Sequence, residues 1–452
     1  MLADVMGIVL TCVFLVLSVW AFYNMPIFAI GVKDFLRNRK KGVLKKSRFA
    51  LLPTFSILIP VKNEEQVIGR LLTAISRFDY PNEKKDIIII EDGSTDETLN
   101  ISKKYARENA NVTLLHRDFS TGKPSALNQG LANAKGEIVA IFDADNIPSP
   151  DALLNVVGYF SEPDVAAVQG KTLSLNSKES MLTQFVSYEE VVYGEVYQRG
   201  KDVLNLFVHL RGSCQFIRRD ILTKLSGFNE DVLSEDIEIS ARLTKNNYRI
   251  RYASDVVAWQ ESAANFQSLF KQRTRWFRGI TELSFKYGSL MSKLSWKNLD
   301  AEATLLAPFI LMFSLLPYLL GAYTLFAVFP SNFILNYVLQ FALLTTTLSL
   351  LLCGLALVYA TKPIKIRNAL WLPFVYLYWS LQAFIAFYAM LLILLRRPKK
   401  WTKTEKTGKI TSLTEDDKVL EDQNNFKNLG AELLVRTEAQ SAEDHVRQSP
   451  KV

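Results

Sequence analysis

Hydrophobic positions are spread unevenly along this 452-residue chain. Residues 6–30 form one apolar stretch, interrupted only by Asn24 and Pro26, and residues 301–395 are mostly apolar with little charge. Between them, residues 55–289 mix apolar and polar positions as a globular protein does. Because a membrane-spanning helix needs about 20 apolar residues, the pattern predicts a globular domain flanked by membrane segments.

The apolar and basic stretches divide the chain into five predicted parts. These are a transmembrane anchor at 1–31, a basic linker at 32–54, the globular domain with an interfacial helix at 55–290, a bundle of about three apolar segments at 301–395, and a basic, then polar and disordered tail at 396–452. No basic region precedes the first apolar stretch, so we interpret it as an uncleaved anchor. Lysines and arginines dominate the linker, which predicts a cytoplasmic domain in a multi-pass protein of the cell membrane.

The side on which the tail lies stays open. Three spans fit residues 301–329, 333–361 and 369–395, and three crossings would place the tail outside. Basic residues after the last span favour the inside instead: Arg396, Arg397, Lys399, Lys400, Lys403 and Lys406. Pro308 and Pro317 would allow the first span to be re-entrant.

Strand and helix patterns alternate through the first half of the globular domain. Strands are predicted at 55–61, 86–91, 112–116 and 137–142, with helices between them, including one at 125–134. This alternation indicates a parallel α/β sheet, and such sheets bind ligands beyond the carboxyl ends of their strands.

Acidic residues stand at two of these strand ends. Asp92 follows a run of four isoleucines, and Asp143 and Asp145 follow the strand at 137–142. The carboxylates of Asp143 and Asp145, two residues apart, are suited to hold Mg²⁺ or Mn²⁺ together with substrate phosphates. Ser94 and Asp96 are better explained as turn and helix-start residues.

Two later segments carry further candidates. Asp236 lies in a predicted first helical turn, where the helix dipole favours its ionised form, although a plain helix-start acid fits as well. Gln272, Arg275 and Trp276 share one helix face and offer an amide, a phosphate-binding guanidinium and a stacking surface for a sugar. A simple interfacial amphipathic helix is the alternative.

Composition excludes several other classes. Three scattered cysteines do not form a disulfide framework or a zinc site. The net charge of +8 comes from basic residues beside apolar segments, which indicates a membrane partner and no nucleic acid.

Six short motifs follow one another along the chain: Ile59-Pro-Val-Lys-Asn-Glu64, Glu91-Asp-Gly-Ser94, Gly122-Lys123, Asp143-Ala-Asp145, Ser234-Glu-Asp236 and Gln272-Arg-Thr-Arg-Trp276. In this order they resemble the motifs of family 2 glycosyltransferases, most closely those of the processive, membrane-bound group that includes cellulose, hyaluronan and poly-N-acetylglucosamine synthases. Ser234 stands where relatives have Thr, and Glu91 where many have Asp. Trp401–Thr404 is loosely similar to a gating segment of hyaluronan synthases.

The resemblance implies a GT-A fold and a role for each motif. Asp236 would be the catalytic base, and Asp143 and Asp145 the metal ligands, with Mg²⁺ or Mn²⁺ as cofactor. Glu235 and Trp276 would bind the acceptor. The nucleotide-sugar donor would be bound by Pro60, Glu64, Asp92, Lys123, Asp143, Gln272 and Arg275.

These roles predict an inverting hexosyl- or N-acetylhexosaminyltransferase. The expected donor is a UDP-linked sugar and the expected acceptor a growing polysaccharide at the cytoplasmic membrane face. One alternative is a single addition to a lipid-linked acceptor. Another is a membrane receptor or transporter that only binds nucleotide sugars, which the presence of both Asp145 and Asp236 argues against.

Overall fold

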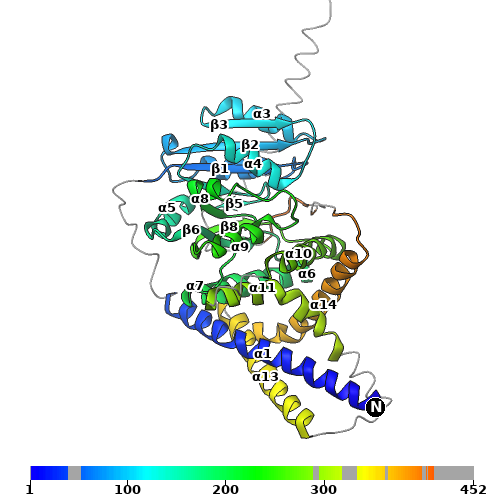
Figure 1. The fold of residues 1–452 in the computed structure, drawn as a ribbon. Coiled ribbons are helices and arrows are strands. Elements are labelled where there is room, and N and C mark those ends of the chain that lie inside the picture. Colours follow the sequence, from blue (N-terminus) through cyan, green and yellow to red (C-terminus); the bar gives the residue numbers. More distant parts are fainter. Residues whose placement is uncertain are drawn as a thin grey trace, which may run out of the picture.

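The computed structural model describes residues 2–38, 52–288, 295–317, 333–361, 365–399, 404 and 406–411. A sheet domain stands on a group of helices that includes α1 (Leu2–Asn38), α11 (Trp296–Phe313) and α13 (Phe333–Ala360) (Figure 1). Three expectations fall outside the described residues: most of the basic linker, Trp401–Lys403, and the tail beyond residue 411.

One eight-stranded sheet organises the globular domain, in the order β3-β2-β1-β4-β7-β6-β8-β5. The strands are β1 (Phe55–Val61), β2 (Lys85–Asp92), β3 (Val112–Arg117), β4 (Ile138–Ile141), β5 (Ile147–Pro148), β6 (Val165–Ser174), β7 (Gln215–Arg218) and β8 (Arg249–Gln260). Strands β1 to β4 pair in parallel, whereas β7 is antiparallel to both of its neighbours and β5 to β8. The predicted parallel sheet is therefore confirmed for its first four strands, and the second half is mixed.

Helices cover both faces of this sheet. One face packs against α2 (Ile68–Ser76), α3 (Thr98–Glu108) and α5 (Ala152–Val157), and the other against α4 (Lys123–Asn133), α8 (Arg219–Lys224) and α9 (Glu235–Lys245). Short 3₁₀ turns lie at η1 (Asn82–Lys84) and η2 (Gly158–Ser161). The isoleucine run of β2 serves both faces, because Ile87 and Ile89 belong to one core and Ile88 and Ile90 to the other.

A long helical segment joins the sheet domain to α1. It runs from α6 (Met181–Val192) through the π-helical η3 (Tyr193–Gln198) into α7 (Arg199–Val203). The backbones approach so closely that a Cβ on Gly31 would lie 1.9 Å from the carbonyl oxygen of Val196. Arg199 also forms an ion pair with Asp34 of α1 at 3.3 Å. The end of α1 is thus fixed to the domain.

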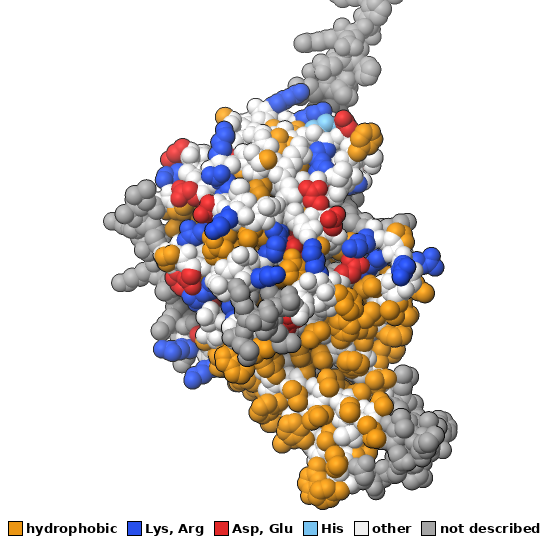
Figure 2. Space-filling model, in the orientation of Figure 1, with side chains coloured by type: hydrophobic (Ala, Val, Ile, Leu, Met, Phe, Trp, Pro, Cys, Tyr) orange, Lys and Arg blue, Asp and Glu red, His pale blue; other side chains and the backbone are white. Residues whose placement is uncertain are grey.

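Three described helical stretches are long and apolar enough to cross a membrane: Gly7–Arg37, Phe333–Ala360 and Ile366–Leu394. The last combines η5 (Ile366–Trp371) with α14 (Leu372–Leu394). Apolar side chains cover the lower part of the molecule in Figure 2, whereas charged residues gather over the sheet domain. Of the predicted span at 301–329, α11 covers residues 301–313, and residues 318–329 lie outside the described residues.

The start of α11 is buried against the domain by a polar contact. Asp300 forms an ion pair with Lys201 of α7 at 3.0 Å, and each side chain is 1% exposed. Tyr23 of α1 donates a hydrogen bond to Asp300 Oδ1 at 2.6 Å, and the amide of Phe207 donates one to Oδ2 at 2.9 Å. This carboxylate therefore connects α1, α7 and α11.

Candidate active site

Several predicted residues meet beyond the carboxyl end of β4. Lys123, the first residue of α4, places its Nζ 2.6 Å from Asp143 Oδ1 and 3.6 Å from Glu235 Oε1. It also donates a hydrogen bond to the carbonyl of Gly212 at 2.9 Å. Asp143 directly follows the strand region, and Glu235 opens α9. The cluster therefore lies at the strand ends, where the sequence analysis looked for a ligand site.

Residues that the sequence analysis missed hold this cluster in place. The amide of Asp143 donates to Ser213 Oγ at 2.9 Å, and that hydroxyl donates to Asn146 Oδ1 at 2.8 Å. Gly212 has a φ of +82°, and a Cβ there would lie 3.3 Å from Asp236 Oδ2. The turn before β7 thus shapes the site, and its glycine was the available signal.

Asp236 lies in the first turn of α9, where its Oδ1 accepts a hydrogen bond from the amide of Ile237 at 2.8 Å. Burial and the neighbouring Glu235 carboxylate raise the pKa of Asp236 to about 7. The helix start favours the ionised form of this carboxyl, as the hydrogen bond from the Ile237 amide does, but burial and the like charge of Glu235 act in the opposite direction. A carboxylate with a pKa near neutrality is well matched to accept a proton at physiological pH.

Two cations face these carboxylates. Burial lowers the pKa of Arg275, and the negative charges of Glu235, Asp236 and Asp143 oppose that shift. The pKa of Lys123 is raised because Asp143 and Glu235 outweigh its burial. Both cations therefore interact electrostatically with the carboxylates of the site.

Asp145 is buried and already has a cationic partner. Its Oδ2 accepts a hydrogen bond from the amide of Glu261 at 3.1 Å and lies 2.5 Å from Lys406 Nζ. Burial acts to raise the pKa of Asp145, but the ammonium of Lys406 outweighs it and holds that pKa below its usual value. Lys406, which we counted in the basic flank of the membrane, lies in the site.

The segment around Lys406 is docked along the site by its backbone. The amides of Thr407 and Gly408 donate to Glu261 Oε2 at 2.9 and 3.3 Å. The amide of Thr411 donates to the carbonyl of Leu175 at 2.9 Å, beyond β6. Residues 406–411, which we call the docked segment, therefore line the side of the site that contains Asp145.

Asp92 lies at the far end of the site, at the end of β2. Ser120 Oγ donates to its Oδ2 at 2.6 Å, and Arg117 Nε lies 3.3 Å from its Oδ1. Pro60 stands near the end of the adjacent β1. The amide of Glu64 donates to Thr98 Oγ1 at 2.7 Å. Burial acts to lower the pKa of Lys406, but the charges of Asp145 and, less strongly, Glu64 outweigh it and raise that pKa.

Three predicted residues lie on α10 (Phe266–Tyr287): Gln272 and Arg275, expected to bind the donor, and Trp276, expected to bind the acceptor. Gln272 Nε2 lies 3.4 Å from Thr404 Oγ1, so this residue meets the chain just before the docked segment. Trp276 stacks against Arg273, whose guanidinium carbon is 4.4 Å from the ring centroid. Helix α10 therefore connects the site with the chain that leaves α14.

The carboxylates fit a divalent cation only in part. Among the residues that the structure describes, no three His, Cys, Asp or Glu side chains converge as a ligand set. Asp143 and Asp145 offer hard oxygen donors, but the Lys406 ammonium already contacts Asp145. Two carboxylates completed by substrate oxygens are a usual arrangement for Mg²⁺.

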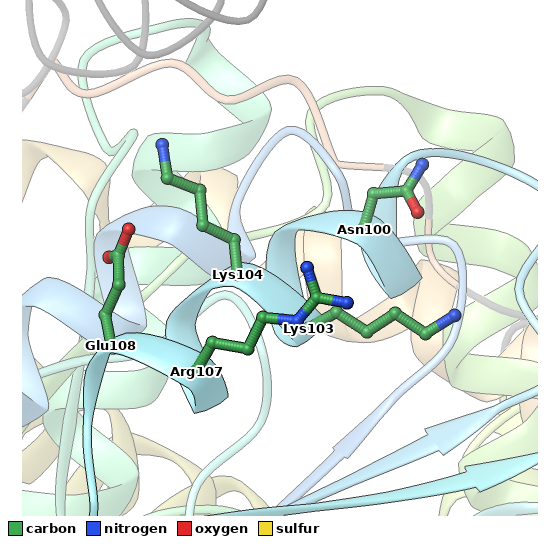
Figure 3. Close-up of a pocket in the computed structure, with 5 residues that line it drawn as sticks. All are labelled: Asn100, Lys103, Lys104, Arg107 and Glu108. Carbon is green, nitrogen blue, oxygen red and sulfur yellow. The ribbon is translucent and has the colours of Figure 1, made fainter.

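A hollow of about 570 Å³ lies elsewhere, along α3 (Figure 3). Its lining side chains all come from one helix: Asn100, Lys103, Lys104, Arg107 and Glu108. It holds none of the strand-end carboxylates, and α3 lies at the opposite end of the domain from α10 (Figure 1). We therefore place the active site at the strand ends.

The mixed sheet and the acidic residues at its strand ends define a glycosyltransferase of the GT-A fold. The chain belongs to glycosyltransferase family 2, since the family model described as "Glycosyltransferase like family 2" matches residues 53–279. The predicted family and fold are thereby confirmed.

Individual relatives differ in their products. A β-monoglucosyldiacylglycerol synthase from Nostoc is 33% identical over 310 residues, which are 66% of this chain and 66% of that protein. A poly-β-1,6-N-acetyl-D-glucosamine synthase from Staphylococcus epidermidis is 26% identical over 324 residues, 70% of this chain and 74% of that one.

A solved structure supports the fold. The mannosyltransferase PcManGT from Pyrobaculum calidifontis, in complex with GDP-Man and Mn²⁺, has a TM-score of 0.55 at 20% identity, and covers 86% of this chain and 100% of that one.

Proposed function

We propose that this chain is an inverting, metal-dependent glycosyltransferase that moves a sugar from a UDP-linked donor to a growing polysaccharide. The observation that supports it most is a carboxyl group close to two cations. Asp236, whose pKa is about 7, interacts with Lys123 and Arg275, and both cations also interact with Asp143. The mechanism requires a base on one side and cationic groups on the other.

Asp236 accepts the proton of the acceptor hydroxyl as that oxygen attacks the anomeric carbon. Lys123 and Arg275 stabilise the negative charge that develops on the leaving diphosphate. Asp143 and Asp145 would hold Mg²⁺ or Mn²⁺, which as a Lewis acid neutralises further phosphate charge. A single displacement from the face opposite the leaving group inverts the anomeric configuration.

Donor and acceptor bind on different parts of the site. Asp92 and Pro60 stand at the ends of β2 and β1, where the nucleoside would lie, and Glu64 and Gln272 flank the diphosphate path. Glu235 and Trp276 stand on the acceptor side. We propose that the protein is embedded in the cell membrane with this domain in the cytoplasm, which the three membrane-length helices and the basic linker support.

A lipid-linked acceptor is the second candidate. Helix α10 packs directly against α14, and Arg273 of α10 is within 3.4 Å of the Tyr378 hydroxyl in that membrane-length helix. The acceptor side of the site therefore adjoins the membrane helices. The Nostoc relative, a β-monoglucosyldiacylglycerol synthase by name, favours the same acceptor class.

The test uses membranes that contain the full chain, a panel of radiolabelled nucleotide sugars, and Mg²⁺ or Mn²⁺. We expect label from a UDP-sugar to enter polymer. Entry into extractable lipid alone would replace the first candidate by the second, and transfer without a divalent cation would contradict the metal assignment.

The role of Asp236 is tested with Asp236→Asn. Loss of a general base typically lowers turnover by about 10²- to 10⁴-fold, while UDP binding should stay measurable. Full transfer by this variant would refute the assignment.

A further inference from the structure

A buried polar cluster joins three helices beneath the acceptor side of the site. Arg273 Nη2 of α10 lies 2.6 Å from Glu189 Oε2 of α6 and 3.4 Å from the Tyr378 hydroxyl of α14. That hydroxyl donates a hydrogen bond to the same Glu189 oxygen at 2.8 Å. Arg273 is 8% exposed and Tyr378 is 6% exposed. We call these three residues the α10 clamp.

The clamp fixes one face of Trp276. The guanidinium carbon of Arg273 lies 4.4 Å from the centroid of this ring, a distance at which a cation is attracted to the π-face. The guanidinium of Arg273 is held in place by its contacts with Glu189 and Tyr378. An acceptor sugar that stacks on Trp276 would therefore have to use the face of the indole opposite Arg273.

The membrane helix has a direct part in this arrangement. Tyr378 packs its ring against Phe185 of α6, with centroids 6.1 Å apart and planes at 17°. This ring contact helps to determine where the Tyr378 hydroxyl lies, and that hydroxyl is the third member of the α10 clamp. A shift of α14 would thus be transmitted through Arg273 to Trp276.

We propose that Arg273 is a positioning residue that orients Trp276 for the acceptor, and that Glu189 and Tyr378 hold it in that role. The proposal rests on the proposed function, since it takes Trp276 as the acceptor platform. Arg273 touches neither donor nor acceptor in this scheme. Its effect is confined to the acceptor side, whereas Lys123, Asp143 and Arg275 act on the donor diphosphate.

The first arm of the test needs no turnover. The full chain in lipid nanodiscs is compared with Trp276→Phe, and the fluorescence difference isolates Trp276 among the seven tryptophans. We expect acrylamide to quench the Trp276 fluorescence more strongly in Arg273→Lys and Tyr378→Phe, because the indole ring loses its fixed partner. Tyr337→Phe is the control, since Tyr337 is 58% exposed on α13.

The second arm measures transfer from UDP-glucose to octyl β-D-glucoside. Loss of the stacking contact should raise the acceptor KM by about three- to thirtyfold in Arg273→Lys, with a smaller rise in Tyr378→Phe and an unchanged donor KM. A purely structural role would instead lower thermal stability and raise both KM values together.

The two arms separate the two hypotheses. Unchanged acrylamide quenching in both variants, or donor and acceptor KM values that rise in parallel, would overturn the positioning role. Absence of any transfer by the wild-type chain would count against the proposed function, and the fluorescence arm would still decide whether Arg273 orients Trp276.

Discussion

Lys406 gives the sharpest test of the metal assignment. Its ammonium lies 2.5 Å from Asp145 Oδ2 and also donates to the carbonyl of Glu261 at 3.1 Å. A divalent cation that uses this carboxylate oxygen has to displace the ammonium first. Lys406→Ala should therefore bind Mn²⁺ more tightly than the wild type in the absence of donor.

The size of the effect follows from the contact that is lost. Hydrogen bonds that involve a charged group contribute about 1.5–3 kcal/mol, and both side chains here are mostly shielded, with 15% exposure for Lys406 and 7% for Asp145. If the cation has to break this contact, its removal tightens Mn²⁺ binding by about 10- to 150-fold. Salt will screen a pair this buried only weakly.

Isothermal titration of Mn²⁺ into the full chain in nanodiscs provides the measurement. Lys409→Ala is the matched control, because Lys409 belongs to the same docked segment but pairs with Glu179 at 3.0 Å and is 63% exposed. It should bind Mn²⁺ like the wild type. Equal affinities in Lys406→Ala and the wild type, or the same gain in both variants, would refute the reasoning.

Three further outcomes are expected. Transfer should fall about tenfold for each pH unit below about 7, where Asp236 becomes protonated, and Glu235→Gln should move this limb to lower pH in a kcat/KM profile. Asp300→Asn should destabilise the chain by about 3–5 kcal/mol in denaturant unfolding, because it leaves Lys201 buried without its charge partner. Gly212→Ala should cost about 1–2 kcal/mol at its φ of +82° and reduce turnover, since the added methyl crowds Asp236; unchanged turnover would contradict this.

Local patterns were sufficient where burial alone determines structure. Strand β1 has the predicted bounds, and β2 exceeds its prediction by one residue at each end, because both are short apolar runs between turns. Asp92 ends β2 and Asp143 comes shortly after β4, so topology alone predicted that both lie at this edge of the sheet.

One strand with charged residues was not predicted by the same reasoning. Strand β8 carries Arg249, Arg251 and Asp255, which a period-two pattern reads as polar surface. In the structure Arg251 Nε pairs with Asp202 at 2.8 Å, and the Tyr159 hydroxyl donates to Asp255 at 2.6 Å. These partners come from distant segments, so nothing near β8 in the sequence reveals them.

The docked segment and the α10 clamp were missed for a related reason. Lys406 and Asp145 are 261 positions apart, and Arg273 and Tyr378 are 105 apart. A lysine after an apolar span is typical of membrane flanks, so composition gave a plausible but different role. Only the folded chain brings these residues to their partners.

Helix α1 is longer than the thickness of a bilayer core requires. Its 37 residues correspond to about 55 Å, whereas the hydrocarbon core of a bilayer is about 30 Å thick. The surplus is not a loose stalk, because Gly31 and Asp34 lock it onto the domain. In a bilayer the domain would then lie at a fixed distance from the lipid surface. A lipid-anchored acceptor would be used only if its hydroxyl extends that far from the surface.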